Sequence, residues 1–374
     1  MSLERYRQAV LPFEEEVLAL RPSEGEVIDV HTHLGLDEDG RSLTRQALVE
    51  MMDQAGVARV CVFPLHDPER HPAYRLPNDR VLQWAGEADG RLVPFCRLDP
   101  AETPIDEGRR ALSAGARGIK LHPRAQAFGF IGPEIDSIFS LAEQTGVPML
   151  IHAGRGLPPV GDQLAEALLR HPALKVILAH AAICDMGILT DRLADHEGVL
   201  YDTSCMFAAD ILNLFARVPA QRIVFGSDPP YGHPSPGQYL VLRVAKAMGL
   251  STDQLRLVLG DTAAQMIDHG RLPERTEPRG EHRIQTTPTL LRLQLYGAMI
   301  VPYLFRGDIG MAQAGIDMAL AVCRDPHPGA AAPALEMIAP ALAAARELLA
   351  DEQMRRLAID LLHRSISLAA TELF

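Results

Sequence analysis

The run Val147-Pro148-Met149-Leu150-Ile151-His152 indicates how this chain folds. Apolar residues and one proline lead to a single histidine, and Gly154 follows two residues later. A short apolar run bounded by turn residues is typical of a fully buried strand in a parallel sheet. Because a polar side chain is costly to bury without a partner, the histidine that ends the run marks a candidate functional position.

Comparable runs recur along the chain and alternate with helical patterns. Further strands are predicted at residues 27–31, 58–63, 92–97, 118–121, 176–180, 199–203 and 222–226. Strands separated by helices imply βαβ units and a parallel sheet. Eight strands fit a closed (β/α)8 barrel, which typically takes about 250 residues. An open doubly wound sheet is the alternative, but no G-x-G-x-x-G motif follows the first strand. We therefore predict an α/β chain built around a TIM barrel.

The residues outside the barrel are predicted to be helical. Apolar positions at helical spacing indicate an N-terminal helix within residues 1–25, before a barrel domain at 26–270. Residues 271–288 are rich in charge and proline, which is typical of a linker. Residues 289–374 show three or four amphipathic helices and no strand pattern. We expect them to form a small helical domain that packs on the barrel or on a partner subunit.

Composition and charge exclude several classes of partner. The chain has 374 residues, a formal net charge of −12 and no basic stripe, so nucleic acid and anionic membranes are disfavoured. Its five scattered cysteines suggest neither a disulfide framework nor a cysteine zinc site. The first residues lack a signal-peptide pattern, and the longest apolar stretch, 290–305, is too short and interrupted to span a bilayer. We expect a cytoplasmic protein that acts on a small molecule.

The first predicted strand contains an H-x-H pair, His31 and His33. Residues two apart on a strand project to the same face, and in a barrel strand that face can be the interior. Two imidazoles that converge at the carboxyl end of a barrel favour a divalent metal site. Taken alone, an H-x-H pair more often represents two satisfied polar residues than a metal site.

Later strands deliver the same kind of residue to the same end of the barrel. His152 and His180 each end an apolar run, and Asp228 follows the run Ile223-Val224-Phe225-Gly226-Ser227. Burying one such group has a structural explanation more often than not, but four strands that each contribute a histidine or aspartate do not. The pattern therefore predicts a metal-centred active site.

The chain resembles the amidohydrolase superfamily, and in particular its amidohydrolase-related branch, which includes aminocarboxymuconate-semialdehyde decarboxylase. The resemblance covers roughly residues 26–270 and has no counterpart for the C-terminal tail. It rests on the H-x-H strand at 28–33, Gly118-Ile119-Lys120-Leu121-His122-Pro123, His152, His180 and Gly226-Ser227-Asp228-Pro229-Pro230-Tyr231-Gly232.

The resemblance implies a set of metal ligands and their roles. His31, His33, His152 and Asp228 would hold one divalent ion, usually Zn²⁺, with Mn²⁺ or Fe²⁺ as alternatives. Asp228 would also accept a proton from the bound water. His180 would polarise the substrate carbonyl or act as an acid–base. A cation held by imidazoles and one carboxylate does lower the pKa of a bound water and polarise a bound oxygen.

Several neighbouring residues are candidates for substrate contact. Lys120 is expected either to contact substrate, to be carboxylated and bridge a second metal, or to be structural; His122 shares its strand parity. Arg155 suits an anionic substrate because a guanidinium pairs well with a carboxylate. Tyr231 is expected to line the pocket. Asp202, at the end of the seventh strand, is expected to orient His180 or a loop, or to contact substrate.

Three functions are consistent with these residues. The first is hydrolysis of an amide, ester or lactone-like bond in a small, carboxylated substrate by metal-activated water. The second is non-oxidative decarboxylation of an unsaturated or aromatic acid by the same ligands. The third, a non-catalytic binding barrel with the helical tail as its interface, is disfavoured by the intact ligand set. The C-terminal helices are also a candidate surface for homo-oligomer formation.

Overall fold

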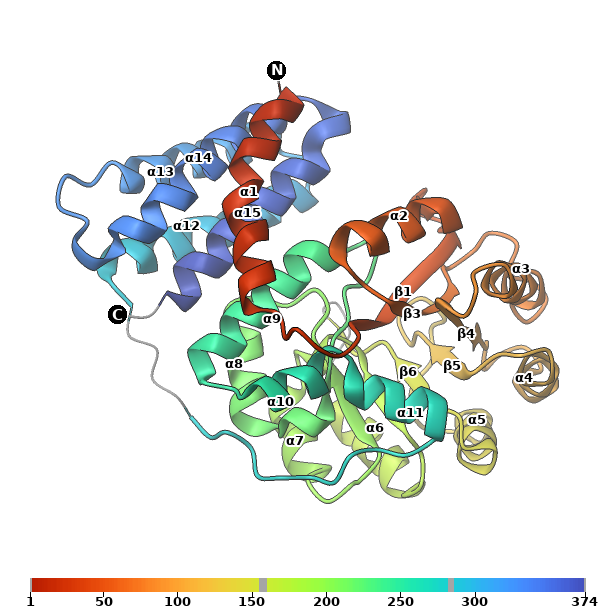
Figure 1. Cartoon of the computed structure of the whole chain (residues 1–374). Coiled ribbons are helices and arrows are strands. Elements are labelled where there is room, and N and C mark those ends of the chain that lie inside the picture. Colours follow the sequence, from red (N-terminus) through yellow and green to blue (C-terminus); the bar gives the residue numbers. More distant parts are fainter. Residues whose placement is uncertain (1, 155–159, 282–285, 373–374) are drawn as a thin grey trace.

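The computed structural model describes residues 2–154, 160–281 and 286–372, and nine strands form one curled sheet (Figure 1). The sheet order is β2-β1-β3-β4-β5-β6-β7-β8-β9; β2 pairs antiparallel with β1 and the other neighbours are parallel. The strands are β1 (Ile28–Leu36), β2 (Ser42–Leu43), β3 (Arg59–Pro64), β4 (Leu92–Arg97), β5 (Gly118–Leu121), β6 (Met149–Ile151), β7 (Val176–Leu178), β8 (Val199–Asp202) and β9 (Ile223–Val224).

The two ends of the curled sheet meet, which closes the barrel. The Val30 amide donates to the Phe225 carbonyl at 2.9 Å, and the Asp228 amide donates to the His31 carbonyl at 2.7 Å. These bonds join β1 to the segment that follows β9. The predicted TIM barrel is therefore confirmed, with eight parallel strands at the predicted places. The short β2 strand was not predicted, because two residues carry no recognisable strand pattern.

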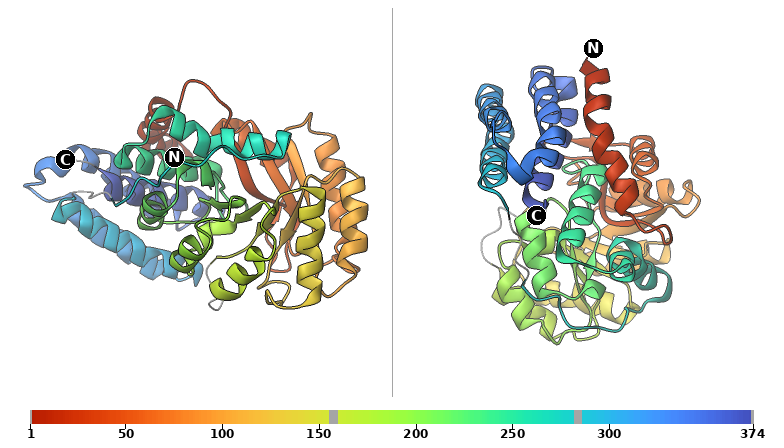
Figure 2. Two further views of the ribbon diagram at one scale, coloured as in Figure 1. Left: turned by 90° about the horizontal axis from the view of Figure 1, so that it is seen from below. Right: turned by 60° about the vertical axis from the view of Figure 1, so that its left-hand side comes forward.

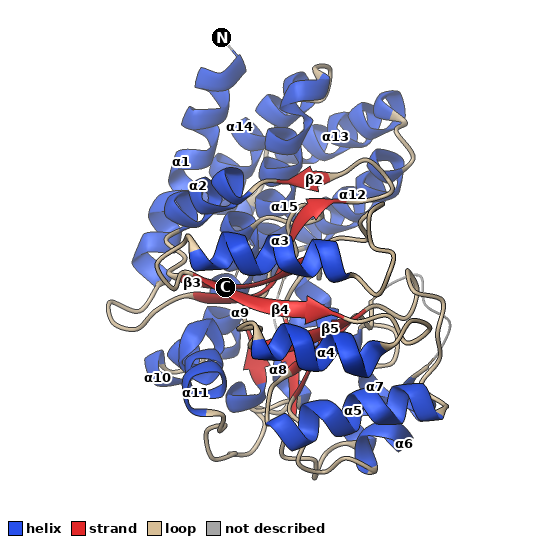
Figure 3. Ribbon diagram, turned by 90° about the vertical axis from the view of Figure 1, so that its right-hand side faces the viewer, coloured by secondary structure: helices blue, strands red, loops and turns tan. Residues whose placement is uncertain are grey.

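Helices cover the outside of the barrel, as the edge-on view in Figure 3 shows. Their inner faces are apolar and bury the outward side chains of the strands, as parallel sheets require. The covering helices are α2 (Arg45–Ala55), α3 (Arg75–Gly86), α4 (Pro104–Ser113), α5 (Pro133–Thr145), α6 (Gly161–Leu169), α7 (Met186–Arg192), α8 (Ala208–Arg217), α9 (Pro234–Met248), α10 (Thr252–Arg256) and α11 (Thr262–His269).

The interior of the barrel holds a separate apolar cluster. It includes Ile28, Phe63, Phe95, Leu150 and Val224, all fully or almost fully buried. Residues of α11 join this cluster where the strands begin, so the amino end of the barrel is closed by apolar side chains. Polar groups are left for the carboxyl end, which is where active sites of TIM barrels form.

A shift in register lets β1 place its histidines inside the barrel. The pairing of β1 with β3 is irregular between Asp29 and Thr32. Val30 belongs to the interior cluster, yet the rings of His31 and His33 also face inward, 5.5 Å and 4.5 Å from the ring of Phe63. A bulge of this kind re-aims side chains and is common beside active sites.

A helical unit stands beside the barrel (Figures 1 and 2). It consists of α1 (Ser2–Leu20), α12 (Pro288–Phe305), α13 (Ile309–Cys323), α14 (Ala332–Leu348) and α15 (Arg355–Thr371). The N-terminal helix α1 packs between α14 and α9, and Phe13 meets Tyr239 of α9 edge to face at 5.3 Å. The two ends of the chain thus build one unit, which the sequence did not indicate.

The described part of the predicted linker lies on the barrel surface. The Pro273 carbonyl accepts a hydrogen bond from Arg222, and the Gly280 amide donates to the carbonyl of Ala216. The extended segment is therefore held along the barrel before the chain enters α12 (Figure 1). Among the helices that the structure describes, none is long and apolar enough to cross a membrane.

Candidate metal centre

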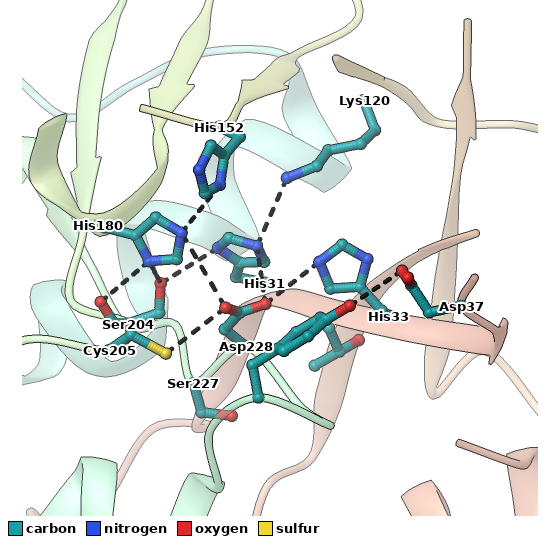
Figure 4. A network of polar contacts seen from close by, with 12 residues as sticks. His31, His33, Asp37, Lys120, His152, His180, Ser204, Cys205, Ser227 and Asp228 are labelled. Atoms are coloured by element: carbon teal, nitrogen blue, oxygen red, sulfur yellow. Dashed lines mark hydrogen bonds and ion pairs between the residues drawn. The ribbon is translucent and has the colours of Figure 1, made fainter. Parts of the chain in front are cut away.

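Two imidazoles and one carboxylate converge at the carboxyl end of the barrel (Figure 4). His31 Nε2 and His33 Nε2 each lie 3.2 Å from Asp228 Oδ1. All three residues are buried. The sequence predicted this convergence from strand ends that lie almost 200 positions apart.

Asp202 orients His31. Its Oδ2 lies 2.8 Å from His31 Nδ1, and both side chains are fully buried. Because a carboxylate only accepts hydrogen bonds, His31 carries its proton on Nδ1 and directs the lone pair of Nε2 toward Asp228. Burial raises the pKa of Asp202, but His31 more than offsets it and the pKa lies at about 2. Its other oxygen, Oδ1, accepts hydrogen bonds from the His180 and Ser204 amides, each at 2.9 Å. Asp202 therefore holds His180 and the loop after β8, as the sequence predicted, and it orients the His31 ring as well.

Asp228 is fixed by the loop that follows β9. It adopts a left-handed backbone conformation with φ of 61°, and the Tyr231 and Gly232 amides donate to its carbonyl at 2.9 and 2.8 Å. The Cys205 thiol donates to Oδ2 at 3.5 Å. Burial raises the pKa of Asp228, but the adjacent imidazoles, led by His31, hold it below its ordinary value. The carboxylate is therefore ionised.

His180 lies beyond the end of its strand. The strand β7 ends at Leu178, and His180 has a φ of 56° in a tight turn, so the direction of its ring could not follow from strand alternation. Its Nδ1 lies 3.2 Å from the Ser204 carbonyl, which places the proton on Nδ1. Its Nε2 then faces Asp228 Oδ2 at 4.0 Å. Burial lowers the pKa of His180.

His152 approaches the cluster from β6. Its Nδ1 lies 3.2 Å from His180 Nε2, while its own Nε2 is buried without a hydrogen-bond partner among the described residues. The ring of His122 stacks on the ring of His152 at 3.9 Å. Burial lowers the pKa of both imidazoles well below the ordinary value. Because His33 has a pKa of about 3, again from burial, three of these rings are neutral, the form in which imidazole binds a metal.

Two buried cations line the opposite side of the site. Lys120 Nζ lies 3.5 Å from His31 Nε2 and 4.6 Å from the centre of the Phe63 ring, and burial lowers its pKa to about 7. Arg97 is the register partner of Lys120 on β4, so both face the barrel interior. The Arg97 guanidinium is 1% exposed and donates to the Pro64 carbonyl at 3.2 Å, and its Nε has no partner among the described residues.

Tyr231 lies at the mouth of the site. Its ring meets His33 edge to face at 5.9 Å, and its hydroxyl donates to Asp37 at 2.9 Å. Asp37 follows β1, so this hydrogen bond joins the β1–β2 connection to the loop that carries Asp228. The other predicted contact to substrate, Arg155, lies outside the described residues.

The comparison with protein families agrees with this geometry. The family model described as Amidohydrolase matches residues 28–268, the whole barrel. The chain belongs to the amidohydrolase family. The family holds metal-dependent hydrolases and decarboxylases, so the chain is an enzyme. No curated protein matches the chain in sequence.

Solved structures place the same fold over the same part of the chain. An uncharacterised TIM-barrel protein from Bordetella bronchiseptica matches with a TM-score of 0.54 and 13% identity, covering 66% of this chain and 99% of its own. A probable 2-pyrone-4,6-dicarboxylic acid hydrolase from Acinetobacter baumannii matches with a TM-score of 0.50 and 14% identity, covering 65% and 99%. The IDCase of Metarhizium anisopliae matches with a TM-score of 0.51 and 16% identity, covering 66% and 98%. These amidohydrolase-like barrels account for about two thirds of the chain.

The donor set of this family member fits a divalent ion. With Asp202 accepting from Nδ1, the neutral His31 ring presents the Nε2 lone pair toward Asp228 Oδ1, and two acceptors that face each other suit a cation between them. Asp228 Oδ1 and His152 Nε2 are also buried atoms without hydrogen-bond partners in the described part of the chain. Imidazole nitrogens with one carboxylate suit zinc, manganese or iron.

Sequence reasoning missed several residues of this site, and two of them, Arg97 and Asp29, carry a signal in the sequence. Arg97 is the last residue of β4, and Lys120 and His152 lie within one residue of the ends of β5 and β6, so this shared position is a signal that could have found it. Asp29 follows Ile28 inside the first strand and accepts hydrogen bonds from the Ser227 amide and hydroxyl. It ties β1 to the loop that carries Asp228. Burial raises the pKa of Asp29 to about 7. A carboxylate in the middle of a buried strand is likewise a signal, because it requires partners.

Proposed function

We propose that this enzyme is a metal-dependent hydrolase whose single divalent ion, Zn²⁺ in the first instance, is held by His31, His33, His152 and Asp228. The observation that carries the proposal is the approach of two imidazole nitrogens to one carboxylate oxygen, each at 3.2 Å. A divalent ion bound there supplies Lewis acidity, which lowers the pKa of a water molecule and polarises a carbonyl oxygen.

Asp228 and His180 are proposed to move the proton. Asp228 Oδ2 accepts the proton of the attacking water, since the carboxylate is ionised and this oxygen faces His180 Nε2. His180 Nε2, 4.0 Å away, is close enough to relay the proton to the leaving group after a small movement. The Nδ1–H of His180 donates to the Ser204 carbonyl. This hydrogen bond keeps the ring in the tautomer whose Nε2 can accept the proton.

Arg97 and Lys120 support a carboxylated substrate. A buried guanidinium without a carboxylate partner is destabilising unless an anion offsets its desolvation. No described acidic residue forms an ion pair with Arg97, and its register partner Lys120 adds a second basic group on the same wall. We propose that this wall receives the carboxylate while the amide, ester or lactone carbonyl lies over the ion.

The same wall favours one ion over two. Lys120 would bridge two metals only as a carbamate, which is an anion and would itself pair with Arg97. Its amine instead lies over the face of Phe63, a contact that favours a cation or a neutral amine over a carbamate. The stoichiometry of bound zinc distinguishes the cases: one ion per chain supports this proposal, and two ions overturn it.

The experiment that tests hydrolysis is a substrate panel with two readouts. Zinc-loaded enzyme is assayed on carboxylated amides, esters and lactones for bond cleavage, and on unsaturated and aromatic acids for release of carbon dioxide. Asp228→Asn is the matched inactive control. Cleavage without carbon dioxide release supports the proposal. Carbon dioxide release alone would replace it with decarboxylation, and zinc binding without either activity would leave a binding barrel.

A further inference from the structure

The helical unit lies outside the residues that match the family, yet one of its helices contacts the segments that flank the loops of the metal centre. The family match ends at residue 268, and α15 begins at Arg355. This helix packs against α9 and α8, the two barrel helices that follow the loops of Asp228 and Ser204. Two adjacent residues of α15, His363 and Arg364, contact those loops.

Arg364 holds the start of α9. It is 1% exposed, and its Nη2 donates to Ser235 Oγ at 2.5 Å. Ser235 lies in the first turn of α9, where its amide donates to the ring of the capping residue His233 at 3.2 Å. Only four residues separate His233 from Asp228. The position of this helix start therefore limits where the Asp228 carboxylate can lie.

His363 holds the other loop. The backbone of Met206, which is 2% exposed, lies close enough to its ring to favour the protonated imidazole, and α15 packs here against α8. Met206 directly follows Cys205, whose thiol donates to Asp228, and lies two residues after Ser204, whose carbonyl faces His180. A single turn of α15 thus contacts both loops that place Asp228 and His180.

Arg364 is also held by residues of the helical unit itself. Arg364 Nε donates to Asp360 Oδ1 at 2.9 Å, and Asp360 Oδ2 accepts a hydrogen bond from the Tyr6 hydroxyl of α1 at 2.7 Å. The guanidinium is therefore fixed between a carboxylate and the Ser235 hydroxyl. The third nitrogen, Nη1, is buried without a hydrogen-bond partner among the described residues, so the guanidinium is held at two of its three nitrogens.

We propose that α15 positions the metal centre: Arg364, acting through Ser235, and His363, acting through Met206, hold the Asp228 and Ser204 loops in the geometry that binds the ion. The inference rests on the proposed function for its metal readout. His363 and Arg364 are positioning residues and do not touch the reacting atoms. Groups that orient a metal ligand typically contribute about 10-fold to 100-fold in metal affinity.

The first measurement needs no metal. Amide hydrogen exchange of the metal-free protein is compared between wild type, Arg364→Met, Ser235→Ala and His363→Phe. The first two variants are expected to speed exchange at residues 228–235, and the third at residues 203–207. Unchanged exchange in these segments would overturn the proposal, because the loops would then be held without α15.

Arg243→Met is the matched control. Arg243 also joins α9 to the end of α15, by hydrogen bonds to Thr371 at 3.0 Å and Glu372 at 2.5 Å, and pairs with Glu16 of α1. It lies toward the far end of α9 from the Asp228 loop. This variant is expected to lower Tm while leaving exchange in both loops as in wild type. Faster exchange in both loops here would mean that general loosening explains the effect.

The second measurement is the Kd for Zn²⁺, by competition with a chromogenic chelator. Ser235→Ala and Arg364→Met are expected to weaken zinc binding about 10-fold or more, Arg364→Lys to restore part of it, and Arg243→Met to leave it unchanged. Equal zinc affinity in all variants would overturn the proposal. Wild-type protein that binds no zinc would refute the proposed function instead, and the exchange data would still decide the role of α15.

Discussion

Two buried arginines show how the barrel site and the helical unit differ. Arg97 in the barrel is 1% exposed and Arg243, on the helix that meets the helical unit, is 3% exposed. Arg243 pairs with Glu16 and Glu372. Among the described residues, the Arg97 guanidinium contacts a carbonyl, an imidazole and an aromatic ring, and the Asp37 and Asp99 carboxylates act on it without forming an ion pair. A buried charge with carboxylate partners holds elements together. A buried charge without them indicates a ligand that brings the opposite charge.

The barrel site and the helical unit also differ in how their other buried polar groups are paired. In the barrel, Asp228 Oδ1 and His152 Nε2 are buried without hydrogen-bond partners in the described segments. In the helical unit, Asp360 is shared by Tyr6 and Arg364, and Arg364 reaches on to Ser235. The helical unit also buries two nitrogens without partners in the described segments, Arg364 Nη1 and His363 Nδ1, but its arginine is paired with the Asp360 carboxylate. We infer that the barrel is arranged for binding and the helical unit for support.

Replacing a ligand of the metal centre is expected to have the largest effect. His33→Ala removes one of the two imidazoles that face Asp228 Oδ1, and should weaken zinc binding by more than about 100-fold, beyond the range of indirect contacts. Activity should fall with it. Zinc content after dialysis, measured by atomic emission, checks this. Retention of a full equivalent of zinc would contradict the ligand assignment.

Removing the group that orients His31 is expected to come next. Asp202→Asn loses the acceptor that fixes the His31 tautomer, so zinc affinity should fall about 10-fold to 100-fold. The measurement is a zinc competition titration, with circular dichroism to confirm the fold. An unchanged Kd would show that Asp202 serves only the structure.

Replacing Arg97 and Arg243 one at a time by methionine separates their roles. Arg97→Met should reduce kcat/KM for a carboxylated substrate by about 10-fold to 100-fold, since a charge-assisted hydrogen bond contributes about 1.5–3 kcal/mol. Its zinc affinity and Tm should stay close to wild type. Arg243→Met should do the reverse and lower Tm with kcat/KM unchanged. A drop in Tm alone for Arg97→Met would refute the proposed carboxylate wall.

His363 gives a pH-dependent prediction of smaller size. Burial lowers its pKa from 6.5 to about 4, so the unfolded chain takes up a proton before the folded chain does. Its contribution to the free energy of unfolding is therefore lost as pH falls from about 6.5 toward 4. Above pH 6.5 this contribution stays constant. Urea unfolding of His363→Phe across this range should show a shallower fall than wild type. Parallel curves would contradict a buried neutral imidazole.

The smallest effect on stability is expected on the outer face of α12. Leu291, Leu295 and Met299 lie four residues apart and are 46%, 56% and 52% exposed. In a chain with net charge −12, such an uncharged stripe is where two copies approach with least repulsion, so we propose a homodimer through this face. Light scattering should show a dimer that Leu295→Glu with Met299→Glu converts to a monomer. A monomeric wild type at all concentrations would exclude it.

The sequence predicted the parts of this molecule that depend on strand periodicity. Apolar runs that end in one polar residue located the strands, and the carboxyl ends of parallel strands must share one face, so His31, His33 and Asp228 were brought together correctly. The orientation of His180 could not be predicted, since it follows from a left-handed turn. The contact of Asp202 with His180 was predicted, but its contact with the His31 ring was not, because strand alternation gives a face of the sheet and not a neighbour across the barrel.

The contacts of the helical unit could not be predicted from the sequence for a different reason. Amphipathic spacing located α12 to α15, but it states only that one face is buried. That α1 joins the same unit, and that Arg364 meets Ser235, depends on contacts between residues more than 100 positions apart. No local pattern encodes such contacts.

The most direct test of the account is a crystal structure of the protein grown with zinc, with the ion located by its anomalous scattering. The account predicts one ion per chain, bound by His31 Nε2, His33 Nε2, His152 Nε2 and Asp228, at distances near 2.0–2.2 Å. Lys120 should be unmodified. An ion held by other residues, a pair of ions bridged by a carboxylated Lys120, or no ion at this site would contradict it.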